Sequence, residues 1–317
     1  MCAIAQYDDM SKLWHERLGH VNFQSLKLME RLQMVHGLPK ISLSPRVCEG
    51  CVMGKQHMES FPQGKSWRAK TPLHLVHSDV MGPFKTSSIG GSRYALTFID
   101  DYSRRIWVYF LQKKDEVFQK FKEFKALTEK QSGKYLKILR TDRGTEYMNK
   151  AFLDFCKEHG IKKESTVSYS PQQNGVAERK NRTIIEMARC MLHSRNLEAK
   201  FWAEAVHTAV YILNRTPTKV VLNITPEEAW SGRKPTISHF RIFGCKAYAH
   251  IPDERRRKLE RKSEKCIMVG YSEESKGYRL YNPRTNEIYI KRNVWFDEDV
   301  KNDNSPTLSF FPILIDE

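Results

Sequence analysis

The stretch SPQQNGVAER, at residues 170–179, opens a predicted helix around which the rest of the chain is organised. Its Glu178 follows Asp142 after 35 intervening residues, and Asp142 follows Asp79 after 62. Asp79 and Asp142 lie where apolar, strand-like runs end, whereas Glu178 lies in the first turns of the helix. Carboxylates gathered in this way supply the oxygen ligands that Mg²⁺ and Mn²⁺ prefer, so we expect a site for two divalent cations.

An α/β core surrounds these acids in the predicted fold. Turns at Gly90-Gly91 and at residues 100–103 make the first three strands an antiparallel meander, and helices follow. The predicted strands cover residues 73–81, 94–99, 106–111, 136–139 and 162–167, and the predicted helices cover residues 113–130, 151–159, 178–195 and 199–214.

Two faces are expected on the helix that carries Glu178. At 100° per residue, a buried apolar face lies opposite a face that carries the carboxylate and two arginines suited to phosphate. The alternative is a solvated face with incidental charge. The carboxylate face comprises Asn174, Glu178, Asn181, Arg182, Ile185 and Arg189, and the apolar face comprises Val176, Ala177, Ile184, Met187, Ala188 and Met191.

Other acids in the same region compete for the metal site. Asp100 and Asp101 fall at a predicted turn, and Asp154 lies on a predicted helix with its side chain expected in solvent. Glu146 is the alternative closest to Asp142, and it would support the metal ligands rather than replace one.

The N-terminal segment has the ligand spacing of a zinc module. His15 and His20, with four residues between them, are followed after 27 residues by Cys48 and Cys51, with two residues between them. Two close pairs of nitrogen and sulfur ligands suit tetrahedral zinc, and so short a segment needs a metal to stabilise its small core. A redox Cys-x-x-Cys pair is the alternative, as is a ligand set in which His36 or His57 replaces one of the four ligands.

Short β-prone runs indicate a small barrel in the last third of the chain, at residues 246–251, 266–271, 278–281 and 287–295. A basic loop between the first two runs is open to three interpretations: a DNA contact, a nuclear-import signal or an exposed charged hairpin. It contains Arg255, Arg256, Arg257 and Lys258. Cys245 and Cys266 are predicted to be buried thiols, and a flexible tail is expected beyond Asp297.

Composition limits the class of protein. The 317 residues suggest two or three domains, and a formal charge of +16 predicts a polyanionic partner, with nucleic acid the leading candidate and a merely basic soluble protein the alternative. Seven cysteines with one paired spacing argue against a disulfide framework and for the cytosol or nucleus. No secretory leader or membrane span is expected.

These motifs together resemble the retroviral and retrotransposon integrases, most closely those of Ty1/copia-type elements. The resemblance covers about residues 13–296. The matching segments are LWHERLGH (13–20), CEGCVMGK (48–55), HSDVMGP (77–83), FIDDYSR (98–104), LRTDRG (139–144) and the helix opening at 170–179.

The resemblance implies a ribonuclease-H-like core, a mixed five-stranded sheet with flanking helices, with Asp79, Asp142 and Glu178 as a catalytic triad. It also implies an SH3-like C-terminal domain and a multimeric active form. Predicted DNA contacts are Tyr169, Gln172, Gln173, Asn174, Arg182, Arg189 and the basic loop; from chemistry alone, Gln172 and Gln173 read base edges or cap the helix. The expected domains are a zinc module (1–62), a linker (63–72), the core (73–232), the SH3-like domain (233–300) and a tail (301–317).

The sequence therefore predicts a DNA integrase, one segment of a larger polyprotein, that uses two Mg²⁺ or Mn²⁺ ions and one structural Zn²⁺. Double-stranded DNA, a homo-oligomer and a nuclear location after cytoplasmic assembly are expected with it. Two rivals stay open: a catalytically idle, domesticated DNA-binding or scaffold protein, and a nuclease of the same fold that only hydrolyses.

Overall fold

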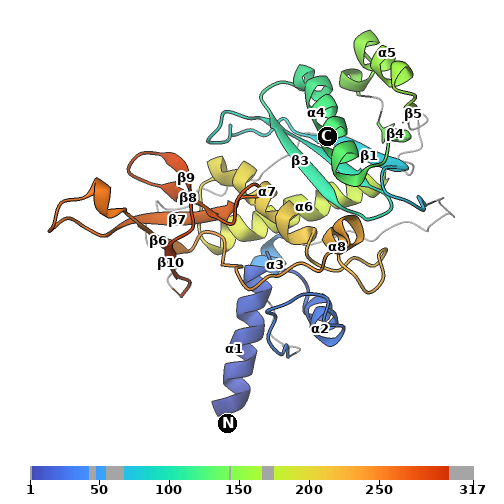
Figure 1. Ribbon diagram of the computed structural model, residues 1–317. Helices are drawn as coiled ribbons and strands as arrows, with labels where there is room; N and C mark the ends of the chain where they lie inside the picture. The colour runs from blue at the N-terminus through green and yellow to red at the C-terminus, as the bar shows by residue number, and fades with distance from the viewer. Residues whose placement is uncertain (1, 43–47, 55–67, 143, 166–174, 300–317) are drawn as a thin grey trace.

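The computed structural model describes residues 2–42, 48–54, 68–142, 144–165 and 175–299, with the side chains of residues 2–9, 165 and 255 left aside. Helices α1 (Cys2–Arg17), α2 (Phe23–Arg31) and α3 (Glu49–Gly54) come first and extend from one side of the molecule (Figure 1). Gly19 and His20 both have positive φ, 61° and 62°, so the chain turns sharply after α1. The side chain of Asn22 then caps α2 by accepting from the Ser25 N–H.

A five-stranded mixed sheet forms the centre of the molecule, in the order β3-β2-β1-β4-β5. β1 is antiparallel to β2 and β2 to β3, whereas β4 is parallel to both β1 and β5. The predicted meander and the two later strands are therefore confirmed. The strands are β1 (Leu75–Met81), β2 (Tyr94–Asp100), β3 (Ile106–Leu111), β4 (Ile138–Thr141) and β5 (Lys162–Ser165).

Helices cover both faces of this sheet (Figure 1). One face packs against α4 and α5 around Phe98, Phe121 and Phe152, each fully buried. The other packs against α6 and α7. The helices are α4 (Val117–Ser132), α5 (Lys150–Glu158), α6 (Gly175–Ser194), α7 (Trp202–Leu213) and α8 (Pro226–Ser231), with 3₁₀ turns at Lys114–Glu116, Thr145–Tyr147 and Ala199–Phe201.

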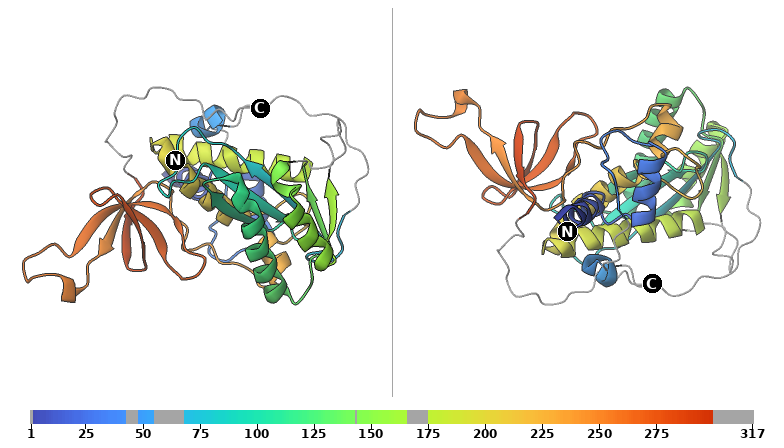
Figure 2. Two further views of the ribbon diagram at one scale, coloured as in Figure 1. Left: turned by 90° about the horizontal axis from the view of Figure 1, so that it is seen from above. Right: turned by 90° about the horizontal axis from the view of Figure 1, so that it is seen from below.

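A second five-stranded sheet, in the order β10-β6-β7-β8-β9, forms the C-terminal part and lies beside α7 (Figures 1 and 2). All its pairings are antiparallel. The strands are β6 (Lys246–His250), β7 (Ser263–Tyr271), β8 (Tyr278–Asn282), β9 (Glu287–Lys291) and β10 (Val294–Asp297), with a 3₁₀ turn at Asp253–Arg255.

The single run predicted over residues 287–295 is wrong. It is two strands, because β9 pairs with β8 at one edge of the sheet and β10 pairs with β6 at the other. The chain must therefore break its pairing at Arg292 and Asn293. The thiols of Cys245 and Cys266 are buried, as predicted, with 0% and 1% exposure.

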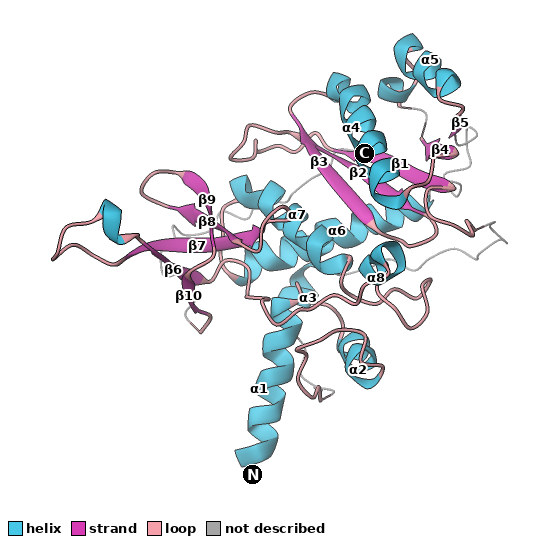
Figure 3. Ribbon diagram, viewed as in Figure 1, coloured by secondary structure: helices cyan, strands magenta, loops and turns pink. Residues whose placement is uncertain are grey.

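One hydrophobic cluster joins the three parts of the molecule. It runs from Trp14 and Leu18 of the N-terminal segment, through Ile184 and Met187 of α6, to Met268 of β7. Figure 3 shows α6 and α7 between the two sheets. Among the described residues, no helix has both the length and the apolar character that crossing a bilayer requires.

Candidate metal sites and nucleic-acid interface

The fold brings three acids, Asp79, Asp142 and Glu178, toward one end of the central sheet. His77 of β1 is level with Arg140 of β4, and continuing this parallel register by two residues brings Asp142 level with Asp79. Neighbouring strands lie about 4.8 Å apart, so the two aspartates are neighbours. Glu178 lies in the first turns of α6, which packs against β1 and β2 on the same side of the sheet.

The three acids interact electrostatically. Burial, and next the negative charge of Asp142, raise the pKa of Asp79 to about 6, and the charge of Glu178 adds to the rise. Desolvation also raises the pKa of Glu178, against the opposing charges of Arg179 and Arg182. Carboxylates that repel one another in this way favour a bound cation. Among the described residues, the side chains whose ligand atoms lie close enough together to hold one ion form a different group, which does not include these three acids.

Asn181, which the sequence analysis places on the carboxylate face without giving it a role, is a residue of the site. Its Nδ2 donates to Asp79 Oδ2 at 2.8 Å, and its Oδ1 accepts from the Thr97 hydroxyl at 2.9 Å. The side chain thus holds the Asp79 carboxylate against β2. Its position three residues after Glu178 was the available signal, because residues three apart on a helix lie on one face.

The predicted separation of two faces on α6 is wrong in part. Asn181 and Ile185, both placed on the carboxylate face, are only 5% and 7% exposed. They are buried because this face of α6 packs against β1 and β2 rather than facing solvent.

Glu146 is a fourth acid close to the same region. Its side chain is 4% exposed, with Lys114 Nζ 3.6 Å from Oε1, and its buried Oε2 has no hydrogen-bond partner among the described residues. A Cβ on Gly144 would lie 2.6 Å from the Glu146 carboxyl carbon, so the glycine makes room for this acid. Burial raises the pKa of the Tyr147 hydroxyl, and the negative charges of Asp79, Asp142 and Glu146 raise it further. An orphaned carboxylate oxygen beside Asp142 fits a region that holds cations.

The rival acids have structural partners instead. Asp100 accepts from the Leu73 N–H and from the Ser103 N–H and hydroxyl, which ties off the turn after β2. Asp101 pairs with His77 Nε2 and with Arg104, both at 3.0 Å. Asp154 is exposed on α5, as expected. Asp100 and Asp101 are thus engaged by other partners and Asp154 lies in solvent, which leaves Asp79, Asp142 and Glu178 as the candidate metal ligands.

The four predicted zinc ligands form a compact group. Ligand atoms of His15, His20, Cys48 and Cys51 all lie within 4.8 Å of one another. His20 Nδ1 lies 3.2 Å from His15 Nε2 and 3.3 Å from Cys48 Sγ, and Cys51 Sγ lies 3.4 Å from His15 Nε2. Ligand atoms around tetrahedral zinc lie roughly 3.3–3.8 Å apart, so this donor set fits the metal.

Local structure orients the His15 ring. Its Nδ1–H donates to the Val21 carbonyl at 2.7 Å, which leaves Nε2 free for a metal. The ring also stacks on Phe23, with centroids 4.6 Å apart. Of the two alternative ligands, His36 is exposed and is not part of this group, and His57 lies outside the described residues.

The predicted DNA contacts are distributed over the molecule. Tyr169, Gln172, Gln173 and Asn174 lie outside the described residues, as does the side chain of Arg255. Arg182 is exposed on α6, and Arg189 is half-buried. In the basic loop, Arg256 pairs with Asp253, whereas Arg257 and Lys258 are exposed. Their role in binding DNA stays a prediction.

Comparison with known families follows the three parts of the chain. A GAG-pre-integrase domain matches residues 1–56, an integrase core domain matches residues 69–171, and a retroviral polymerase SH3-like domain matches residues 245–309. Asp79 and Asp142 lie inside the integrase core match, and Glu178 lies just beyond its end. The central sheet is thus the ribonuclease-H-like fold and the C-terminal sheet the SH3-like domain that the resemblance implied.

Curated relatives match almost the whole chain. The retrovirus-related Pol polyprotein from transposon TNT 1-94 of Nicotiana tabacum is 45% identical over 295 residues, which are 93% of this chain and 22% of that protein. The polyprotein from transposon RE2 of Arabidopsis thaliana is 32% identical over 287 residues, 90% of this chain and 19% of that protein. The chain therefore spans about a fifth of the length of these relatives.

Solved structures offer a more distant comparison. The HTLV-2 integrase catalytic core domain in complex with magnesium is 20% identical, with a TM-score of 0.40, and the match covers 51% of this chain and 99% of that chain. The chain is 45% identical to a curated relative over 93% of its own length, and it carries three matched domains in order. It therefore belongs to the integrase family of Ty1/copia-type, retrovirus-related Pol polyproteins.

Proposed function

We propose that this chain is a polynucleotidyl transferase that inserts element DNA into target DNA. The reaction would proceed by 3′-end processing and strand transfer, with double-stranded DNA as substrate. The observation that carries the proposal is that Asp79, Asp142 and Glu178 lie close enough to act on one another electrostatically, in a chain whose core matches an integrase core domain.

Divalent cations fit the chemistry of this donor set. Two Mg²⁺ or Mn²⁺ ions, when bound, supply activation of the attacking oxygen and stabilisation of the leaving oxygen. Asp79, Asp142 and Glu178 would hold these ions. Asn181 keeps Asp79 Oδ2 in a fixed orientation through its 2.8 Å hydrogen bond, so this carboxylate is already positioned before a cation binds.

The chemistry consists of two displacements at phosphorus. In processing, a water oxygen bonds to phosphorus near the DNA end, and the bond from phosphorus to the 3′-oxygen breaks to leave a 3′-hydroxyl. In strand transfer, that hydroxyl bonds to a target phosphorus, its proton goes to solvent, and the target 3′-oxygen leaves. Neither step needs a covalent intermediate with the protein, so carboxylates rather than a nucleophilic side chain suit the site.

Other features of the proposal follow from charge and from the zinc group. A formal charge of +16 supports binding to DNA, through attraction to the phosphate backbone. His15, His20, Cys48 and Cys51 would hold one structural zinc ion. A homo-oligomer that brings two DNA ends together, acting in the nucleus after cytoplasmic assembly, completes the proposal.

A joining assay tests this function. Purified chain is incubated with Mn²⁺, a labelled duplex end and a supercoiled plasmid, and the labelled products are separated on a gel. Joined product is the expected result. Cleavage without joining would identify a nuclease, and binding without cleavage would identify a scaffold protein.

Variants of the acids test the site. Asp79→Asn and Glu178→Gln should each reduce joining by at least about 10³-fold while DNA affinity changes little, because a metal ligand is lost without a change of shape. Asp154→Asn, which alters an exposed acid of the same core, is the matched control and should join normally. Full joining by Asp79→Asn would remove these acids from the mechanism.

A further inference from the structure

The outer face of the C-terminal sheet exposes large aromatic side chains, which is unusual. Along β6, Ala247 and Ala249 face inward and are fully buried, whereas Tyr248 and His250 face outward. Trp295 of β10 pairs directly with Tyr248, so the indole lies on the same outer face, and it is 65% exposed. Two alanines of β6 thus face the interior here, whereas Trp295 lies largely in solvent and Tyr248 is partly exposed. This reverses the usual arrangement of a half-buried strand and indicates a binding surface.

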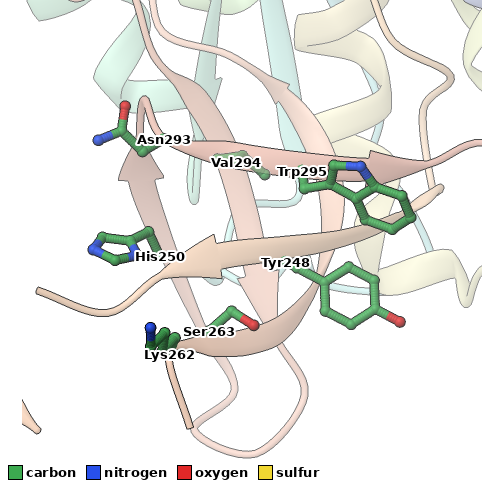
Figure 4. A pocket seen from close by; sticks show the side chains of 7 residues that line it. All are labelled: Tyr248, His250, Lys262, Ser263, Asn293, Val294 and Trp295. Atoms are coloured by element: carbon green, nitrogen blue, oxygen red, sulfur yellow. The ribbon is translucent and has the colours of Figure 1, made fainter.

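These side chains line a hollow of about 690 Å³ on β6, β7 and β10. Figure 4 shows the Tyr248 and Trp295 rings side by side at one end, with His250, Lys262 and Asn293 toward the other. The two ring centroids are 5.5 Å apart and the rings are tilted by 51°. One end of the hollow thus offers aromatic surface, and the other offers nitrogen donors.

The charge around the hollow is mainly positive. Lys265, opposite Tyr248 on β7, extends the aromatic row, and Lys246 begins the next row on the same face. Asp297, opposite Lys246, is the acid among the outward positions of these rows. The loop from β6 to β7 adjoins the hollow, and its six arginines and lysines outnumber Asp253, Glu254 and Glu260. This balance complements a polyanion.

We propose that this face binds single-stranded nucleic acid, with unpaired bases stacked on Trp295 and Tyr248 and phosphates near Lys262, Lys265 and His250. A sheet that presents aromatic side chains on adjacent strands, flanked by lysines, suits unpaired bases, because every base has a flat face that stacks without regard to sequence. Bases inside a duplex do not expose that face. The inference goes beyond the proposed joining reaction and does not depend on it.

The test measures binding without added divalent ions, so that catalysis plays no part. A fluorescein-labelled oligo(dT) 20-mer and a 20-base-pair duplex are titrated with the full chain at one fixed salt concentration, and anisotropy is recorded. Trp295→Ala and Tyr248→Ala should each weaken oligo(dT) binding roughly 5- to 150-fold, the effect of losing one stacked base. Duplex binding should change less than about 2-fold.

Two further variants keep the test decisive. Trp295→Tyr preserves an aromatic face and should retain most of the affinity for oligo(dT), which a loss of folding would not allow. Ile290→Ala removes a 50% exposed apolar side chain from β9, outside the hollow, and should bind normally. Unchanged oligo(dT) binding by Trp295→Ala would overturn the proposal. Equal losses for duplex and single strand would also overturn it and would instead make the face a duplex-binding surface.

Discussion

At the scale of single residues, the candidate metal site depends on partners that hold the acids as well as on the acids themselves. The Asp79 carboxylate receives one N–H from Asn181 and one from its neighbour Val80, and both lower its pKa against the effect of burial. The ionised form that a cation requires is therefore maintained near neutral pH partly by Asn181.

Asn181→Ala should weaken divalent binding without removing a ligand. The pKa of Asp79, already about 6, would rise further, so less of the carboxylate is ionised at pH 7. We expect roughly a 10- to 100-fold loss of Mn²⁺ affinity, measured by calorimetric titration, with partial recovery at pH 8.5. Thr183→Ala, which removes a hydroxyl bonded only within α6, is the control. A Mn²⁺ affinity equal to that of the parent chain would show that Asn181 does not position Asp79.

His239 should make the fold sensitive to acid. Burial, with the nearby charges of Arg215 and Arg241, lowers the pKa of His239 from 6.5 to about 4, and its Nε2 lies 3.0 Å from the Tyr211 hydroxyl. Between pH 6.5 and 4 the unfolded chain binds a proton that the folded chain does not, so the free energy of unfolding falls as pH falls through this window. At about 1.36 kcal/mol per pKa unit, the loss at pH 4.5 would be about 2.6 kcal/mol, and solvent screening of this half-buried ring reduces it to about 2 kcal/mol.

His239→Gln should remove that part of the pH dependence. Urea denaturation at pH 7.0 and pH 4.5 would show a smaller difference between the two free energies of unfolding than in the parent chain. His159→Gln, at an exposed position on the end of α5, serves as the comparison and should leave the difference unchanged. An undiminished difference in His239→Gln would mean that other groups cause the acid sensitivity.

At the scale of elements, α6 connects the zinc group to the three acids. Its first turns carry Glu178, and its later part contacts α3, the helix that contains Cys51. There, the Cys190 thiol donates to the Gly50 carbonyl at 3.0 Å. A Cβ at Gly54 would lie only 2.4 Å from Cys190 Sγ, so the close approach of α3 and α6 requires glycine.

Gly54→Ala should therefore loosen α3 from α6. We expect the free energy of unfolding to fall by about 1–3 kcal/mol, with faster hydrogen exchange in α6, because the new methyl group overlaps the sulfur. Adding Cys190→Ala removes the sulfur and should restore most of the loss, a rescue that a general effect of alanine would not give.

Gly90→Ala is the matched glycine control, since the nearest atom to its added Cβ is Ser88 Oγ at 3.9 Å. Zinc content, measured by metal analysis, should stay at one ion per chain in all these variants if the zinc group is intact. If adding Cys190→Ala to Gly54→Ala did not restore stability, the result would contradict the contact between α3 and α6.

The sequence predicts a helix or strand well where residues close in sequence determine its bounds, and poorly where contacts with distant segments determine them. The strands of the meander and the helix at 150–158 follow local apolar patterns, and their predicted bounds agree with the structure to within a few residues. The break between β9 and β10 depends on which distant strands they pair with, so a single β-prone run conceals it. The burial of Asn181 and Ile185 likewise depends on β1 and β2 packing against α6.

The same distinction applies to the sites. The zinc ligands were predictable because both pairs have a local spacing, and they lie together in the structure. Asn181 was placed on the correct helix face, but its hydrogen bond to Asp79 was not predicted, because Asp79 is 102 residues away. The outward position of Trp295 was hidden as well, since the register that places it beside Tyr248 joins strands far apart in the chain.

At the scale of the whole molecule, Glu298 joins the three parts. Its carboxylate accepts from Arg17 Nε at 3.0 Å and from the Ile242 N–H at 2.7 Å, and its carbonyl accepts from Arg195 at 2.7 Å. These partners belong to α1, to the chain that enters the C-terminal sheet and to the end of α6. Both charged side chains of the Arg17–Glu298 pair are largely buried, at 16% and 12% exposure. Solvent therefore screens this pair less than an exposed one.

Glu298→Ala should weaken the coupling among these parts. Loss of the carboxylate leaves Arg17 without its partner and the Ile242 N–H without an acceptor, so we expect a loss of about 2 kcal/mol in the free energy of unfolding. The hydrophobic cluster and the Glu298 contacts together join the three parts, so the parent chain should unfold in a single transition. Without the Glu298 contacts, the parts of the variant should unfold separately.

Urea titrations followed by zinc release and by tryptophan fluorescence distinguish these outcomes. The two curves should coincide for the parent chain and separate for Glu298→Ala, with zinc released at the lower urea concentration. Glu287→Ala removes an exposed glutamate of β9 that accepts only from the nearby Tyr289 hydroxyl, and its curves should still coincide. Coincident curves in Glu298→Ala, at an unchanged midpoint, would mean that the shared hydrophobic cluster alone holds the three parts together and that the Glu298 contacts add nothing to it.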